Sequence, residues 1–458
     1  MGRKVFISIL GTGFYDLCNY ETEKPSHFRS KETRFIQQAT LEYLLKQEDS
    51  WTEKDVAYIF LTEKAKIDNW LTSPTGKRLN KKKSKEENYD GLLYELENMH
   101  LPFPFEGVGM ADGMTDEKMW SAFNTIFEKI KDDDDLYLDV THGFRYLPML
   151  LLVLCNYAKY LKNVKIKSAT YGNFEATLPD DAHPLMNLLP LVQLQDWTTA
   201  ATNFTRFGDT KQLTDLCLQK NSKQTKKYAP KLQEFFDDIR FCRGDELRGG
   251  KADELLKNMV FAWNSTAMPI NHIAEKIIEN VKPVSSTDEY SNLFNMAALC
   301  YNYKQYQAAV TILEESVLSF ILFECSGDFY NNYHPVINGA NENEDTREFR
   351  AKGLIKEAVK MSIYRYKNYD DLGDNYWGNE VDNKESVNDI LQYDFFQDEK
   401  NLPVFECIEE IRNIRNDYNH SGHRFSMNEI KSKLQDAIKL IQYRYIKQDV
   451  PIIKLNDD

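Results

Sequence analysis

The feature that most constrains the fold is a series of short, largely apolar runs, each followed by a turn that contains glycine or threonine. Four such runs lie at residues 5–10, 57–61, 136–140 and 164–170. Helical patterns at 32–46 and 146–161 fall between them. Apolar strands joined by helices are typical of a parallel sheet that is covered on both faces. The sequence therefore predicts an α/β domain over residues 1–190.

The pattern changes near residue 190, and from Leu191 onward no strand is predicted. Helices are predicted at 191–207, 211–218, 229–242, 252–264, 288–302, 305–325, 347–361, 403–420 and 426–445. A chain of 458 residues is long enough for two or three domains. We therefore expect a second, all-α domain over residues 191–458. The polar insert at 338–386 has no predicted role.

The charge balance and the cysteines limit the function classes. A net charge of −14 argues against broad, non-specific adhesion to nucleic acid or to an anionic membrane. Seven cysteines occur singly, without a CxxC pair, so neither disulfides nor a zinc site is predicted and a cytoplasmic location is expected. The most apolar stretch, residues 147–155, is shorter than the about 20 residues that cross a bilayer. A basic stretch at 77–85 is predicted to be a solvated loop.

Two of the predicted strand ends carry residues suited to binding an anion. Ligands of parallel sheets bind beyond the carboxyl ends of the strands. The first strand ends in Gly11-Thr12-Gly13, and the third in Thr141-His142-Gly143, with Arg145 just before a helix. Free N–H groups at a helix N-terminus bind phosphate, and arginine can donate to phosphate or stack on a base. The alternative from spacing alone is a helix cap with polar neighbours. Neither a dinucleotide fingerprint nor a P-loop is present.

A second motif lies near the end of a predicted amphipathic helix, in the sequence Arg415-Asn416-Asp417-Tyr418-Asn419-His420. Its apolar stripe is Cys407, Ile411, Ile414 and Tyr418, and Asn416 and His420 lie together on the opposite side. An imidazole can act as general acid or base, and a guanidinium can neutralise a phosphate. Such a set suits attack of an RNA 2′-hydroxyl on the adjacent phosphate without a metal. A solvated polar face is the alternative that the pattern leaves open.

Together these stretches resemble a known family. The R-x4-H motif from Arg415 to His420 resembles that of HEPN ribonucleases. The turn at 11–13 and the stretch at 139–145 resemble those of CARF domains, which sense cyclic oligoadenylates. Residues 195–209 and 303–309 resemble parts of the family's helical half. The domain order resembles the CARF–HEPN effectors of type III CRISPR systems.

The resemblance implies a Rossmann-like CARF sensor followed by an all-α HEPN domain. It implies catalytic roles for Arg415, Asn416 and His420. It implies that the activator is bound by Gly11, Thr12, Gly13, Thr141, His142, Gly143 and Arg145. The implied activity is metal-independent cleavage of single-stranded RNA, leaving 2′,3′-cyclic phosphate ends and requiring no cofactor. The activator is expected to be a cyclic oligoadenylate, with cyclic tetra-adenylate favoured, bound across a homodimer or a higher oligomer.

Three other functions remain open at this point. The first is a CARF-like sensor joined to a non-catalytic helical module that regulates or scaffolds. The second is a metal-dependent nuclease, which would want a carboxylate cluster on strands that the second half lacks. The third is a sensor that also cleaves its own ligand, because His142 and Arg145 could serve that chemistry.

Overall fold

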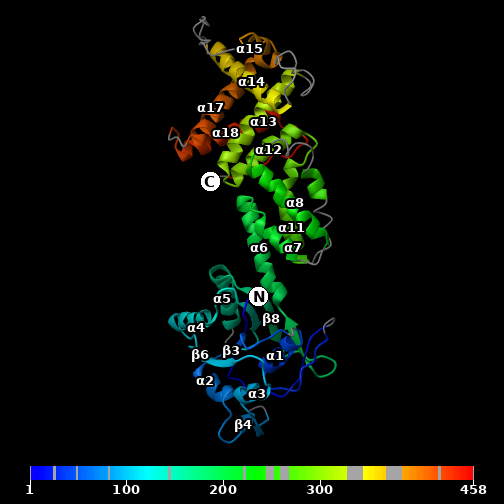
Figure 1. Cartoon of the computed structure of the whole chain (residues 1–458), viewed down its shortest axis with the longest axis vertical. Coiled ribbons are helices and arrows are strands. Elements are labelled where there is room, and N and C mark those ends of the chain that lie inside the picture. Colours follow the sequence, from blue (N-terminus) through cyan, green and yellow to red (C-terminus); the bar gives the residue numbers. More distant parts are fainter. Residues whose placement is uncertain are drawn as a thin grey trace. The chain divides into compact units, whose positions relative to one another are not determined.

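The computed structural model divides the chain into two compact units, Met1–Gln195 and Asp196–Asp458 (Figure 1). We describe each unit by itself. The structure describes residues 2–23, 27–47, 50–80, 83–142, 146–219, 223–243, 252–257, 268–326, 344–367, 384–420 and 424–456.

Unit 1 is built on a seven-stranded sheet with the order β2-β9-β8-β7-β1-β3-β6. All neighbouring strands are parallel except β8 and β9, which are antiparallel. The strands are β1 (Lys4–Leu10), β2 (Tyr20–Glu21), β3 (Val56–Leu61), β6 (Phe105–Gly109), β7 (Asp135–Asp139), β8 (Lys165–Gly172) and β9 (His183–Asn187). The four predicted strands correspond to β1, β3, β7 and β8, so the predicted α/β class with a mostly parallel sheet is confirmed.

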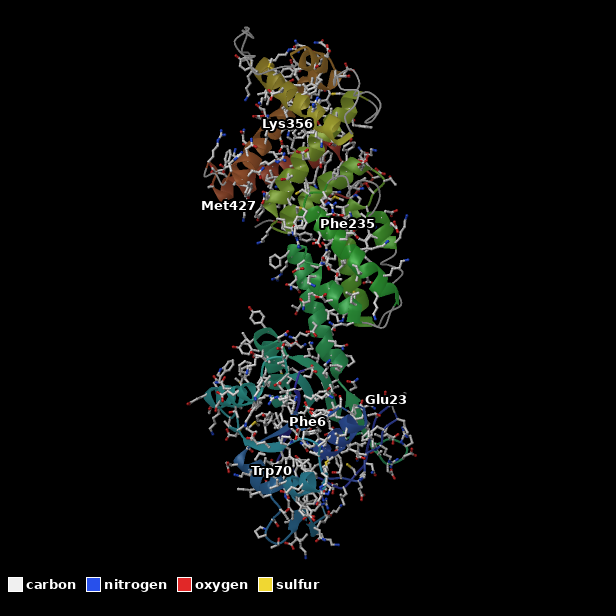
Figure 2. The ribbon with its side chains drawn as sticks, in the orientation of Figure 1. Phe6, Glu23, Trp70, Phe235, Lys356 and Met427 are labelled. Atoms are coloured by element: carbon white, nitrogen blue, oxygen red, sulfur yellow. The ribbon has the colours of Figure 1, made fainter. Side chains whose placement is uncertain are left out.

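Helices cover both faces of this sheet because successive side chains of a strand point to opposite sides. Val5, Ile7 and Ile9 of β1 pack in one core with buried residues of α4 and α5. Phe6 belongs to the opposite core, with residues of α1 and α3, and lies inside unit 1 (Figure 2). The helices of unit 1 are α1 (Ile36–Gln47), α2 (Glu63–Ala65), the π-helical turn η1 (Lys66–Trp70), α3 (Leu92–Asn98), α4 (Asp116–Lys129) and α5 (Leu147–Lys162).

Unit 1 contains elements that the sequence prediction lacked, among them β2, β9, α3 and α4. The basic stretch at 77–85 is not a loop but contributes to a hairpin of β4 (Lys77–Asn80) and β5 (Lys85–Asn88). Most of its described side chains are exposed, as predicted, but Asn80 is buried. The edge strand β6 escaped prediction because its sequence lacks a continuous apolar run. A side chain at Gly107 would meet the Trp70 ring at 2.6 Å, so this strand needs glycine there.

The described residues of unit 2 form helices and connecting loops and contain no strand, as predicted. Its helices are the C-terminal part of α6 (Leu189–Phe207), then α7 (Lys211–Gln219), α8 (Lys223–Arg240), α11 (Met268–Val281), the 3-10 turn η2 (Lys282–Val284), α12 (Glu289–Asn302), α13 (Tyr306–Ser326), α14 (Glu344–Tyr366), α15 (Lys384–Ile390), α16 (Asp394–Gln397), the 3-10 turn η3 (Glu399–Asn401), α17 (Leu402–Asn419) and α18 (Met427–Tyr445). Helix α11 was not predicted. Parts of the predicted helix at 252–264 and of the insert at 338–386 lie outside the described residues.

Helix α17 lies between other helices of unit 2 and presents the expected apolar stripe to them. It packs against α13, α14 and α18. Cys407, Ile411 and Ile414 are buried, and Tyr418 is half-buried against the same core. Helix α18 begins with a capping box, in which Ser426 Oγ accepts from the Glu429 N–H and the Glu429 carboxylate accepts from the Ser426 N–H. The stripe fixes which face of α17 is left for polar groups.

Candidate functional site

The carboxyl ends of four neighbouring strands of unit 1 surround a pocket of about 290 Å³. It is lined by Ile9 and Leu10 at the end of β1, by Gly11, Thr12, Gly13 and Tyr15 after β1, by Thr62 after β3, by Met110 after β6, and by Thr141 and His142 after β7. The structure thus brings together five of the seven residues for which the sequence predicted a ligand-binding role. The other two, Gly143 and Arg145, lie outside the described residues.

A buried carboxylate fixes the hydroxyl of Thr141 at the pocket wall. Asp139 accepts from Thr141 Oγ1 at 2.5 Å, from the Thr141 N–H at 3.1 Å and from Ser8 Oγ at 2.7 Å. Thr141 Oγ1 in turn accepts from the Gly172 N–H at 2.8 Å, which ties β7 to the end of β8. Burial raises the pKa of Asp139, although the three donors oppose that rise. With its own proton committed to Asp139, Thr141 presents an acceptor, not a donor, to its remaining surroundings.

His142 has an environment that suits ligand contact. Its ring stacks on Tyr15, with centroids 4.4 Å apart and planes inclined by 22°. Its Nε2 is buried and has no hydrogen-bond partner among the described residues. Burial lowers the pKa of His142 to about 4, so the ring is neutral at neutral pH. A buried polar atom without a partner is costly unless a ligand satisfies it.

Five residues of this pocket were not among the predicted ligand-binding residues: Ile9, Leu10, Tyr15, Thr62 and Met110. Tyr15 follows the predicted turn by two residues, and an aromatic ring so close to a glycine turn was a signal that we did not use. Burial raises the pKa of Tyr15, so its hydroxyl keeps its proton. Met110 gave no signal, because it follows the strand that escaped prediction.

The second candidate site lies at the C-terminal end of α17. Arg415 does not face open solvent there: its Nη1 lies 2.9 Å from Glu314 Oε2 and 2.8 Å from Glu315 Oε1, both on α13. Glu314 is only 1% exposed and also pairs with Lys356 of α14, which is labelled in Figure 2. Glu315 also pairs with Lys352 at 3.1 Å. Arg415 therefore belongs to a network of two carboxylates and three cations.

The charges of this network hold its members ionised. Burial works against the charged form of Glu315, but Lys352, Lys356 and Arg415 lower its pKa. Burial likewise works against the charged form of Arg415, while Glu314 and Glu315 raise its pKa. The Arg415 guanidinium is therefore fully charged, and it is paired with the carboxylates of Glu314 and Glu315.

The other two predicted catalytic residues are exposed. Asn416 lies on the solvent side of α17, and His420 ends the helix, where its N–H donates to the Asn416 carbonyl at 3.1 Å. No hydrogen bond joins the Arg415 and His420 side chains among the described contacts. Residues 421–423, which follow His420 and include His423, lie outside the described residues. The structure therefore places a histidine and an amide in solvent next to a paired arginine.

The described residues form no cluster of three or more histidine, cysteine or acidic side chains suited to a metal ion. No described helix combines the length and the apolar content that crossing a membrane requires. No disulfide bond joins any of the seven cysteines, all of which lie among the described residues.

Comparison with known proteins agrees with this division of the chain. Residues 5–175 match the family model of the CARF domain of the CRISPR system endoribonuclease Csx1. Residues 193–286 match the model of the second domain of the CRISPR-associated protein MJ1674. That protein, from Methanocaldococcus jannaschii, is 23% identical over 333 residues, which are 67% of this chain and 48% of the relative. The chain thus spans about half the length of this curated relative.

A solved structure, Enterococcus italicus Csm6 bound to cyclic hexa-2′-fluoro-hexa-dAMP, is similar with a TM-score of 0.44 and 11% identity. The similarity covers 98% of this chain and 96% of that chain. Unit 1, with its parallel sheet and its strand-end pocket, is a CARF domain. The chain is therefore similar to CRISPR-associated proteins that contain a CARF domain.

Proposed function

We propose that this chain is a metal-independent endoribonuclease, activated when its CARF domain binds a cyclic oligoadenylate. The observation that carries the sensing half is the strand-end pocket, in which a glycine-rich turn, Thr141 and the unpartnered Nε2 of His142 converge. Backbone N–H groups of such turns bind phosphate, and the stacked pair of Tyr15 and His142 offers aromatic surface to a base. The domain match and the bound ring of the similar Csm6 structure agree with this ligand class.

The nuclease half rests on the end of α17. In the proposed reaction His420 takes the proton from the 2′-hydroxyl or gives one to the leaving oxygen, and Arg415 stabilises the negative charge on the phosphate. Asn416 orients either group. The exposed positions of Asn416 and His420 support this assignment. Arg415 must exchange Glu314 and Glu315 for the phosphate, so in the proposed mechanism the network holds the guanidinium until RNA competes for it.

We further propose that the active unit is a homodimer. Arg415 and His420 lie about 140° apart around an ideal helix, so one helix encloses a phosphate poorly. Two helices related by a two-fold axis would bring four side chains to one cleft. Activation is then a population shift toward a dimer that binds the ring more tightly.

An exposed apolar face on α5 supports self-association. Met149, Val153, Tyr157 and Tyr160 repeat at helical spacing and are 48–88% exposed, and Leu152 and Leu161 flank them. The opposite face of α5 is buried in the domain core. Six such side chains expose on the order of 600 Å², most of the about 800 Å² that each partner contributes to a stable interface. A second copy of the same helix would cover this face.

The ion pairs of Arg415 favour one other candidate, a CARF sensor joined to a non-catalytic helical module. In that case Arg415 only joins α17 to α13. An RNA-cleavage assay with cyclic tri-, tetra- and hexa-adenylate, with and without EDTA, separates the two. We expect one of these cyclic oligoadenylates, called the ring below, to trigger RNA cleavage that persists in EDTA and leaves 2′,3′-cyclic phosphate ends. Ring binding without any cleavage would favour the non-catalytic module.

A further inference from the structure

The Asn69 side chain is hydrogen-bonded to the backbone of the glycine turn at residues 11–13. This side chain is fully buried on η1, and its Nδ2 donates to the carbonyls of Gly11 and Gly13, each at 2.8 Å. Its Oδ1 accepts from the Tyr89 hydroxyl at 2.7 Å. The amide therefore has a fixed orientation, with both donor positions committed to the turn.

Arg78, on strand β4 of the hairpin, is hydrogen-bonded to the same turn. We call the contacts of Asn69 and Arg78 with the turn the grip. Its Nη2 donates to the Thr12 carbonyl at 3.0 Å and its Nη1 to the Gly13 carbonyl at 3.1 Å. Nη1 also donates to Asn69 Oδ1. The guanidinium lies 5.1 Å from the ring centroid of Tyr89. Because its donors are committed to the turn and to Asn69, Arg78 acts here as a support for the backbone.

These contacts decide where the N–H groups of the turn point. A trans peptide is planar, and its N–H points opposite to its carbonyl. Since the carbonyls of Gly11, Thr12 and Gly13 all face Asn69 and Arg78, the N–H groups of the following residues, Thr12, Gly13 and Phe14, face away from them. None of these three N–H groups has an acceptor among the described residues. Successive N–H groups on one side of a turn form a site for an anion.

We propose that Asn69 and Arg78 are positioning residues that fix the turn at 11–13 so that its N–H groups meet a phosphate of the ring. This inference rests on the proposed ligand and adds the residues that shape its site. It also gives the hairpin a role, because β4 carries Arg78 to the turn. There the guanidinium also lies 3.8 Å from Asp68 Oδ2 and over the rings of Phe14 and Tyr89.

Two substitutions test the grip with little change of size. Arg78→Lys keeps the charge but loses the planar fork that reaches two carbonyls at once. Asn69→Asp replaces the donating amide with a carboxylate oxygen that would face two carbonyls. Lys77→Ala is the matched control, because Lys77 is an exposed cation next to Arg78 and its hydrogen bonds with Ser73 are made by its main chain. All are made in the full chain.

Three measurements are compared for each protein: hydrogen exchange of the segment 9–16 without ring, the Kd for cyclic tetra- and hexa-adenylate by calorimetry, and RNA cleavage against ring concentration. For Arg78→Lys and Asn69→Asp we expect the exchange rate and the Kd to rise by about tenfold or more, because each variant loses one or two hydrogen bonds to the turn. The ring concentration for half-maximal cleavage should rise by the same factor, while the maximal rate stays at the wild-type value. A merely structural role would lower the maximal rate as well.

Wild-type exchange and wild-type Kd in both variants would overturn the inference. So would equal effects in Lys77→Ala, since these would show a general response to the loss of a cation. A wild-type chain that binds neither ring would defeat the proposed function instead. In that case faster exchange in the two variants alone would still establish the grip on the turn, and unchanged exchange would refute it.

Discussion

Arg415 and Glu314 lie 101 residues apart in the chain and form an ion pair of 2.9 Å between α17 and α13. Glu314 is 1% exposed, so the pair is anchored on a buried carboxylate that also meets Lys356. Removing one partner of a buried pair leaves the others without compensation, which costs about 3–5 kcal/mol. The network therefore contributes to the stability of unit 2 whatever else it does.

We expect Glu314→Ala to lower the free energy of unfolding of the helical unit by about 3 kcal/mol, because Arg415 and Lys356 both lose a buried partner. Glu315→Ala removes a carboxylate that is 36% exposed and should cost about 1 kcal/mol or less. Urea titration followed by a probe in unit 2 measures both. Equal costs for the two variants would contradict the assignment of Glu314 as the anchor.

Arg415→Ala or His420→Ala should reduce ring-activated RNA cleavage by at least about 100-fold, the lower range for general acid–base catalysis. Ring affinity should stay at the wild-type value, since the CARF pocket is untouched. Arg412→Ala is the control, because Arg412 lies one turn earlier on α17 and pairs with Glu409 instead. Full activity of the Arg415 and His420 variants would refute the catalytic assignment.

His142 should make the chain less stable in acid. Burial lowers its pKa to about 4 in the folded state, against 6.5 for an exposed histidine. Between these values the unfolded chain binds a proton that the folded chain does not, so the free energy of unfolding falls as the pH falls through this window. The full effect is about 3 kcal/mol.

His142→Gln isolates this contribution. Asp139 acts in the opposite direction, because its raised pKa lets the folded chain bind a proton first, and the variant keeps that effect. Denaturation at pH 7 and pH 4.5 should show a smaller acid loss in the variant than in the wild type. An equal loss in both proteins would show that His142 is not buried neutral.

A composite nuclease site predicts a particular result when subunits mix. Wild-type chains are combined with the Arg415→Ala/His420→Ala chain and allowed to exchange. If both subunits contribute to one cleft, heterodimers should be largely inactive, and activity per wild-type chain should fall as the mutant fraction rises. Activity that stays proportional to wild-type chain alone would indicate independent sites.

If the exposed apolar face of α5 forms the dimer contact, a charge placed on that face should disrupt the dimer. Val153→Glu places a charge at the centre of that face and should convert the dimer to monomer in sedimentation at micromolar concentration, because an unpaired charge is costly to bury. Glu128→Lys on α4 alters charge outside the face and should leave the dimer intact. A dimer that survives Val153→Glu would place the contact elsewhere.

Local patterns determined much of this protein. The continuous apolar runs predicted β1, β3, β7 and β8, because a strand that is buried on both faces consists largely of apolar residues. Parallel order then placed the turn at 11–13 and the pair Thr141 and His142 at one edge. The spacing of Cys407, Ile411 and Ile414 likewise fixed the buried face of α17.

Only the tertiary structure decided which distant side chains meet. Arg78 lies 65 residues from Gly13, in a stretch whose charge indicated a loop, yet it grips the turn. Glu314 and Arg415 lie on different helices, and the periodicity within either helix does not predict that they pair. Hydropathy and spacing report how one element presents its faces to a core. Pairings between elements depend on how those faces come together, and that is settled by packing across the whole fold.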